Sequence, residues 1–132
     1  MTDFRFILID DDQVSNMISK LTIEKVLGKI DIQVFTNAET ALKYIESEYS
    51  KPVLKKTILL LDINMPIMSG WEFLEQFEKL STDIRNCIHI YMLTSSLDGR
   101  DRDRSLSLEY IKDHLVKPLT TEVVHAQILE RT

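Results

Sequence analysis

Short apolar runs alternate with amphipathic segments along the whole chain. The apolar runs are too short for buried helices and read instead as strands covered on both faces. They comprise residues 4–9, 32–35, 57–61, 87–93 and 114–116. The first run stops abruptly at three consecutive aspartates, Asp10, Asp11 and Asp12.

The segment after the first run carries the stripe of an amphipathic helix, with apolar residues at i, i+3, i+4 and i+7. These positions are Val14, Met17, Ile18 and Leu21. Asp12 is the expected cap of this helix, and Gly28 stands where a C-terminal glycine is common.

Four further helices are predicted between and after the remaining strands. The second follows a cap at Asn37 and has its apolar positions at Ala38, Ala41, Leu42 and Ile45. The others cover residues 70–80, with Trp71, Leu74 and Phe77 facing the core, a segment near Leu106 and Tyr110, and residues 121–131. The polar residues 47–56, which include Pro52, are expected to form an exposed loop.

This order repeats strand and helix five times, which predicts an α/β fold with a doubly wound parallel sheet. In such a sheet the carboxyl ends of all strands lie at one edge. Ligands bind at that edge, where the strand order reverses.

Composition narrows the class of protein only a little. The 132 residues suit one domain, and no apolar run approaches the roughly 20 residues of a membrane span. The single Cys87 cannot form an internal disulfide, which fits a reducing cytoplasm. A net charge of −5 argues against nonspecific binding to nucleic acid.

Four strands end in residues that can do chemistry: Asp10 with Asp11, then Asp62, Thr94 and Lys117. Taken singly, each is more often a turn former, a helix cap or a solvated loop residue. Together at one edge, the carboxylates would repel one another unless a cation lay among them. Oxygen ligands without Cys or His favour a hard ion such as Mg²⁺, and the neighbouring ammonium and hydroxyl suit phosphoryl transfer onto an aspartate.

Four motifs carry a resemblance to a known family: residues 7–12, residues 60–70, residues 92–96 and residues 115–119. The second contains Asp-x-x-Met-Pro-x-x-x-Gly, which is specific in this order and context. The chain resembles the response-regulator receiver domain of two-component systems, in its single-domain, chemotaxis-protein-like form. The resemblance covers essentially residues 1–132 and implies a flavodoxin-like fold with strand order 2-1-3-4-5 and no output domain.

Carried over residue by residue, the resemblance implies that Asp62 accepts the phosphoryl group. Asp10, Asp11, Asp62 and the backbone carbonyl of Asn64 would hold Mg²⁺. Lys117 would pair with the phosphoryl oxygens.

The resemblance also implies that Thr94 moves to hydrogen-bond the phosphoryl group, as a switch. Asn64 and Ser96 would tune its hydrolysis, and a cis peptide bond would precede Pro118. The family usually places Tyr or Phe three residues before the lysine, whereas this chain has His114. His114 either replaces that ring as a packing group or alters how the phosphorylated state is displayed, with a pH dependence.

The expected function is a phosphorylation-dependent switch that takes its phosphoryl group from a histidine kinase or a histidine phosphotransfer protein. It would signal through a downstream protein or a phosphorelay, with homodimerisation on phosphorylation as a further option. It would be no enzyme beyond its own phosphorylation and slow dephosphorylation. The alternatives are a Mg²⁺-dependent phosphatase with an aspartyl-phosphate intermediate, a flavodoxin-like cofactor module, and a degenerate receiver that only binds partners.

Overall fold

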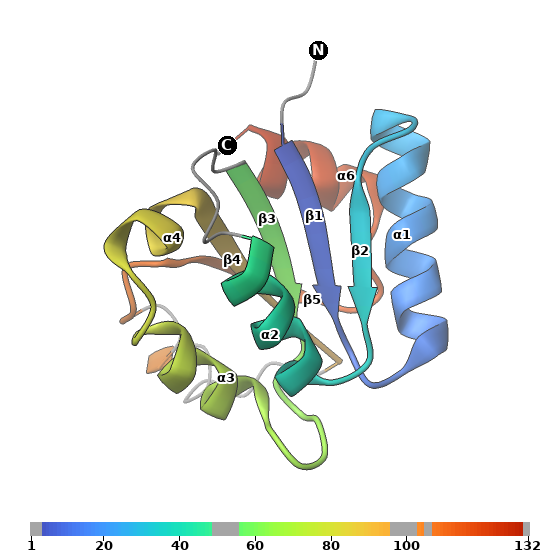
Figure 1. Ribbon diagram of the computed structural model, residues 1–132. Coiled ribbons are helices and arrows are strands. Elements are labelled where there is room, and N and C mark those ends of the chain that lie inside the picture. Colours follow the sequence, from blue (N-terminus) through green and yellow to red (C-terminus); the bar gives the residue numbers. More distant parts are fainter. Residues whose placement is uncertain (1–3, 49–55, 96–102, 105–106, 131–132) are drawn as a thin grey trace.

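A five-stranded parallel sheet forms the centre of the molecule, as the computed structural model shows (Figure 1). The structure describes residues 4–48, 56–95, 103–104 and 107–130. The strands are β1 (Phe4–Ile9), β2 (Ile32–Phe35), β3 (Lys56–Leu61), β4 (Ile88–Thr94) and β5 (Ile111–Val116). Their order is β2-β1-β3-β4-β5, which confirms the predicted architecture.

Helices cover both faces of this sheet. They are α1 (Gln13–Leu27), α2 (Ala38–Glu48), α3 (Gly70–Phe77), α4 (Thr82–Cys87) and α6 (Thr121–Val123), which continues as the wider π-helical segment η1 (Val124–Leu129). One face carries α2 and α3, and the other carries α1, α6 and η1. Among the described residues, no helix is both long enough and apolar enough to cross a membrane.

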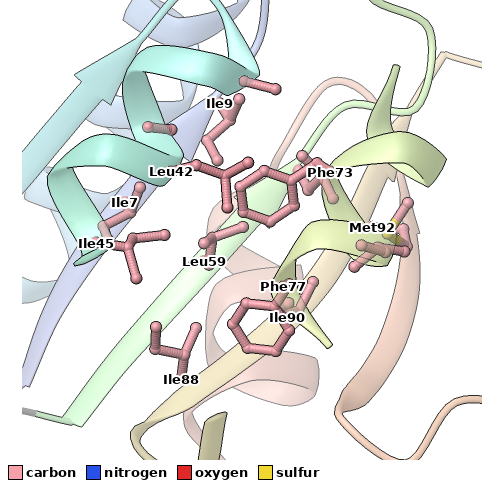
Figure 2. Packing of buried hydrophobic residues seen from close by; sticks show 14 of the residues in the cluster. Ile7, Ile9, Leu42, Ile45, Leu59, Phe73, Phe77, Ile88, Ile90 and Met92 are labelled. Atoms are coloured by element: carbon pink, nitrogen blue, oxygen red, sulfur yellow. The ribbon is translucent and has the colours of Figure 1, made fainter. Parts of the chain in front are cut away.

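Neighbouring residues of each strand point to opposite faces and enter different cores. In β1, Ile7 and Ile9 face α2 and α3, whereas Phe6 and Leu8 face α1 and η1. Figure 2 shows the first core, where side chains of α2 and α3 lie over the sheet: Leu42, Ile45, Phe73 and Phe77. Because both faces are covered, the central strands are apolar at nearly every position, which explains why the apolar runs in the sequence are almost uninterrupted.

The apolar stripe of α1 does not face the sheet, contrary to the usual behaviour of an amphipathic helix. Its four residues are exposed, with 59% of Leu21 open to solvent, and they are Val14, Met17, Ile18 and Leu21. The buried positions of α1 are instead Asn16, Ser19 and Ile23. The periodicity correctly predicts a helix, but the helix turns its apolar stripe outward.

Asn16 explains why a polar residue faces inward. Its side-chain NH₂ donates hydrogen bonds to the carbonyl oxygens of Asp10 at 2.8 Å and Phe35 at 3.3 Å. These carbonyls lie where β1 and β2 end, and buried carbonyl groups need partners. Asn16 therefore ties α1 to the ends of two strands.

Both predicted caps at the first two helices are confirmed. Asp12 accepts hydrogen bonds from the backbone of Val14 and Ser15, and Asn37 accepts one from the backbone of Thr40. The predicted C-terminal Gly28 has a φ of 73° and donates to the carbonyl of Glu24.

Some predicted boundaries were wrong. Helix α3 ends at Phe77 rather than at residue 80, and the short α4, capped by Ser81, was not predicted. Strand β5 begins at Ile111, three residues before the predicted start. A helix was expected near Leu106 and Tyr110. In this region residues 103–104 are helical and residues 107–110 form turns, while Leu106 lies outside the described residues. The same holds for most of the loop expected over residues 47–56.

Trp71 is half-buried against the core at the start of α3, as expected. In addition, the guanidinium carbon of Arg104 lies 4.2 Å from the centroid of its ring, a cation–π contact that the sequence did not indicate.

The inward face of α1 leads to a stability prediction. Asn16→Ala leaves the buried carbonyl of Asp10 and the partly buried carbonyl of Phe35 without this donor and is expected to lower the free energy of unfolding by about 1–3 kcal/mol. Leu21→Ala removes a larger but exposed side chain and is expected to cost less than about 0.5 kcal/mol. Urea denaturation of the two variants provides the comparison. A larger loss for Leu21→Ala would contradict the outward orientation of the stripe.

Candidate functional site

The ends of β1 and β3 bring two aspartates together. Ile9 and Leu61 are paired in the register of these strands, and the next residue of each is an aspartate, Asp10 or Asp62. The backbone N–H of Asp62 donates to the carbonyl of Ile9 at 2.9 Å, which extends the pairing to the site.

Asp11 completes an acidic cluster at this edge. One carboxylate oxygen from each of Asp10, Asp11 and Asp62 lies within 4.8 Å of the other two. Asp10 and Asp62 are buried, whereas Asp11 is exposed. Two full charges at this separation repel by about 3.5 kcal/mol at an effective dielectric of 20, so the cluster is suited to hold a metal ion.

Lys117 supplies positive charge to the cluster. Its ammonium nitrogen lies 2.6 Å from Oδ2 of Asp10 and 3.7 Å from Oδ2 of Asp62. The peptide bond between Lys117 and Pro118 is cis, as the resemblance implied. The backbone N–H of Lys117 donates to the carbonyl of Thr94 at 2.7 Å, which joins the ends of β4 and β5.

Thr94 is the buried last residue of β4, beside the end of β5 where Lys117 follows. The next residue, Ser95, is exposed, and Ser96 lies outside the described residues. The structure thus places Thr94 at the same edge as the acidic cluster.

His114 lies two residues before the end of β5 and is buried. It is paired with Met92 in the register of β4 and β5, and Met92 belongs to the core under α2 and α3. Paired residues of neighbouring strands point to the same face, so His114 lies on that face. It is not one of the residues that the structure brings into the acidic cluster.

The loop after Asp62 returns tightly to the sheet. The backbone N–H of Gly70 donates to the carbonyl of Ile63 at 2.8 Å. A Cβ atom at position 70 would lie 2.6 Å from the backbone oxygen of Asp62, so only glycine fits there without a shift of the backbone. This contact gives a physical reason for the glycine of the Asp-x-x-Met-Pro-x-x-x-Gly motif. Within the loop, the backbone N–H of Asn64 points to Oδ1 of Asp62 at 3.4 Å.

Ile67 forms a strained turn in this loop. Its φ is 69°, and the N–H of Met68 donates to the carbonyl of Pro66 at 2.8 Å, which makes Ile67 the centre of a γ-turn. A left-handed conformation costs roughly 1–2 kcal/mol in a residue with a Cβ, and it is especially rare in β-branched residues. No pattern in the sequence indicated this strain.

The environment of Asp62 disfavours its charged form. Its pKa is raised to about 7, first by burial and then by the negative charge of Asp10, whereas Lys117 acts in the opposite direction. The ammonium group of Lys117 alone does not cancel the effects of burial and of Asp10 on the pKa of Asp62. The site is therefore one in which added positive charge would restore the Asp62 carboxylate at neutral pH.

The strand order and the acidic site at the carboxyl edge define a receiver-like α/β domain. Residues 6–129 match the family described as response regulator receiver domain, and the chain belongs to that family. A two-component response regulator from Cytophaga hutchinsonii has a similar solved structure, with a TM-score of 0.88 and 26% sequence identity over 98% of this chain and 97% of that one. As a class, receiver domains work in phosphorylation-dependent signalling and interact with histidine kinases or phosphotransfer proteins and with downstream targets.

Two curated relatives are longer proteins. The Haemophilus influenzae protein named transcriptional regulatory protein CpxR homolog is 30% identical over 94% of this chain and 48% of its own length. The Halalkalibacterium halodurans protein named probable C4-dicarboxylate response regulator DctR is 28% identical over 96% of this chain and 50% of its own length. The chain thus spans about half the length of these relatives.

The raised pKa of Asp62 predicts a pH-dependent effect of Asp62→Asn in metal-free buffer. The carboxyl titrates at 3.8 when unperturbed and at about 7 in the folded protein, so the folded state binds the proton more tightly. Wild-type stability should therefore fall as the pH rises from about 4 to about 7. The asparagine variant lacks this loss, so we expect it to be more stable at pH 8 by on the order of 2 kcal/mol, which is less than the full shift because solvent screens part of the effect.

Urea denaturation of both proteins with EDTA at several pH values checks this expectation. The difference between them should shrink towards pH 4. A difference that stayed constant from pH 4 to pH 8 would show that the burial of the Asp62 charge is not its cause.

Proposed function

We propose that this chain is a phosphorylation-dependent switch that accepts a phosphoryl group on Asp62. The observation that carries this proposal is the convergence of Asp10, Asp11, Asp62 and the Lys117 ammonium group at one edge of the sheet. An ammonium group and a metal-binding acidic cluster around one buried carboxylate offset the charge of a transferring phosphoryl group. Membership of the receiver family supports the same assignment.

The metal of this site is proposed to be Mg²⁺, which receiver domains generally bind at their acidic pocket. Asp10, Asp11 and Asp62 offer only oxygen ligands, which suits a hard ion, and the backbone carbonyl of Asn64 would add a fourth oxygen. When bound, Mg²⁺ would supply charge that favours the ionised form of Asp62 and the phosphoryl oxygens. Each carboxylate would then serve as a ligand rather than as a proton acceptor.

The transfer itself is a nucleophilic displacement at phosphorus. A carboxylate oxygen of Asp62 forms the new O–P bond while the N–P bond of a donor phosphohistidine breaks. The other ring nitrogen of the phosphohistidine carries a proton before the N–P bond breaks, so the histidine leaves as a neutral imidazole and both charge and atoms balance. Lys117, which lies 2.6 Å from Asp10 in the structure, would move its ammonium group to the incoming phosphoryl oxygens.

Four residues are proposed to act once Asp62 is phosphorylated. The Thr94 hydroxyl would hydrogen-bond the phosphoryl group, because Thr94 ends the strand beside the one that leads to Lys117. Asn64 and Ser96 would tune the rate of hydrolysis, as the family resemblance implies. His114, buried on β5 at the position of the usual aromatic residue, would transmit the change to the surface of the domain.

A protein, rather than a metabolite, is the proposed physiological donor. The exposed stripe of Val14, Met17, Ile18 and Leu21 leaves apolar surface open along α1, and such patches commonly mark sites of protein contact. A cavity of about 220 Å³, lined in part by Val14, Ile18 and Pro118, continues this surface to the loop that carries Lys117. The stripe therefore extends to the acidic site. This is expected of a surface on which a histidine kinase or phosphotransfer protein docks.

The chemistry is testable without knowing the donor. Incubation with acetyl phosphate and millimolar Mg²⁺ should raise the intact mass by one phosphoryl group, and EDTA should prevent it. Asp62→Asn should abolish the labelling because it removes the nucleophile. Mass spectrometry of the intact protein gives the readout.

Asp12→Asn is the matched control for this experiment. Asp12 belongs to the same run of aspartates but caps α1, and asparagine caps equally well, so labelling should persist. Absence of labelling in the wild type, or labelling that survives Asp62→Asn, would refute the proposed acceptor.

The α1 surface makes a separate prediction. Met17→Glu places a charge in the exposed stripe and is expected to slow labelling by a phosphorylated donor protein about tenfold, which corresponds to about 1.4 kcal/mol. Lys25→Gln, at the far end of the same helix, changes the net charge equally and should have little effect. The donor is the purified histidine kinase or phosphotransfer protein of the source organism that labels the wild type fastest. Equal rates for both variants would exclude the stripe as the docking surface.

A further inference from the structure

Ile67 is an unexpected residue at its position. It is the centre of a γ-turn with a φ of 69°, a conformation that glycine and asparagine adopt far more readily than a β-branched residue. Its side chain is also 87% exposed, so it contributes almost nothing to either core. Neither the turn nor the packing of this domain accounts for an isoleucine.

The turn lies close to the phosphoacceptor. The loop that begins at Asp62 is closed at its base by the hydrogen bond from Gly70 to Ile63. Ile67 is three residues before Gly70, so their Cα atoms are at most about 11 Å apart. Figure 1 shows this loop, between β3 and α3, projecting beyond the edge of the sheet at which β1 and β3 end.

A donor protein that reaches Asp62 must cover this turn. A typical stable interface takes about 800 Å² from each partner, and a round patch of that area has a radius of about 16 Å. A Cβ atom at Gly70 would lie 2.6 Å from the carbonyl oxygen of Asp62, so Ile67, at most about 11 Å from Gly70, falls within a patch of that size centred on the acceptor. A downstream target or a second copy of this chain has no comparable need to approach Asp62.

The surface beside the turn is hollowed. A cavity of about 180 Å³ lies between Pro66, Ile67 and Met68 on one side and the start of α2, from Asn37 to Thr40, on the other. An exposed apolar side chain next to a recess is a shape that a complementary protein surface can engage from both sides.

We propose that Ile67 is a contact residue for the phosphodonor protein and that it helps to select among donors. Its side chain would pack against apolar surface of the donor next to the phosphohistidine, which buries an apolar group that is open in the free domain. This inference rests on the proposed function of Asp62 as phosphoacceptor. It assigns to the β3–α3 turn a role in recognition, separate from the chemistry of the acidic cluster.

Three substitutions at position 67 separate contact from conformation. Ile67→Asn and Ile67→Gly both relieve the left-handed strain and should raise the melting temperature, by about 4 °C. Both also remove the apolar contact, and we expect labelling by the phosphorylated donor protein to slow about tenfold. Ile67→Met keeps an apolar side chain and should retain most of the wild-type rate. Labelling by acetyl phosphate, which needs no docking, should be unchanged in all three.

The outcomes distinguish this inference from the proposed function. Failure of acetyl phosphate to label the wild type would refute the acceptor itself. If acetyl phosphate labels every protein and donor labelling of Ile67→Asn stays within twofold of the wild type, the contact role of Ile67 is refuted alone. The same conclusion follows if the substitutions leave donor labelling unchanged but change dimerisation, as measured by light scattering. The protein that covers Ile67 would then be a second copy of this chain. The proposed apolar contact would also be refuted if the donor labelled Ile67→Met as slowly as it labels Ile67→Asn and Ile67→Gly.

Discussion

The crowding of three carboxylates at one edge of the sheet is the constraint on which the rest of the site depends. Parallel pairing of Ile9 with Leu61 forces the residues that follow, Asp10 and Asp62, to lie side by side. Burial prevents water from screening them, and the pKa of Asp62 rises to about 7 as a result. The fold thus holds a carboxylate whose charged form is disfavoured until positive charge arrives, which is a suitable starting state for a switch.

Contacts within the surrounding loops hold Asp10 and Asp62 in position. The N–H of Asp12 donates to Oδ1 of Asp10, and Asn16 donates to the backbone carbonyl of Asp10, so both ends of that residue are held. Gly70 lets the loop after Asp62 fold back against the strand. These contacts fix the positions of the two aspartates at the end of the strands, where a cation can reach both carboxyl groups.

The sequence correctly predicted the strands, which are buried on both faces of the sheet. Strands covered on both faces are apolar at nearly every position, and their order along the chain and the residues at their ends followed from that pattern. The spatial order 2-1-3-4-5 was instead an implication of the family resemblance. The direction of α1 did not follow, because a stripe such as Met17 and Leu21 reveals the period of a helix but not which side meets the sheet. The inward side depends on Asn16, whose partner carbonyls come from two strands distant in sequence. Helix α4 was missed because its six residues are too few to show a period.

The residues that departed from expectation share a physical feature. The stripe on α1 and Ile67 place apolar side chains in water, where they stabilise neither core, and Ile67 adds backbone strain. A domain selected only for stability would have polar residues on α1 and glycine or asparagine at position 67. Both surfaces also adjoin the edge where Asp62 lies, one through the loop of Lys117 and the other through the loop of Gly70. Exposed apolar surface that costs stability and surrounds the proposed phosphoacceptor is best explained by a protein that covers it during transfer.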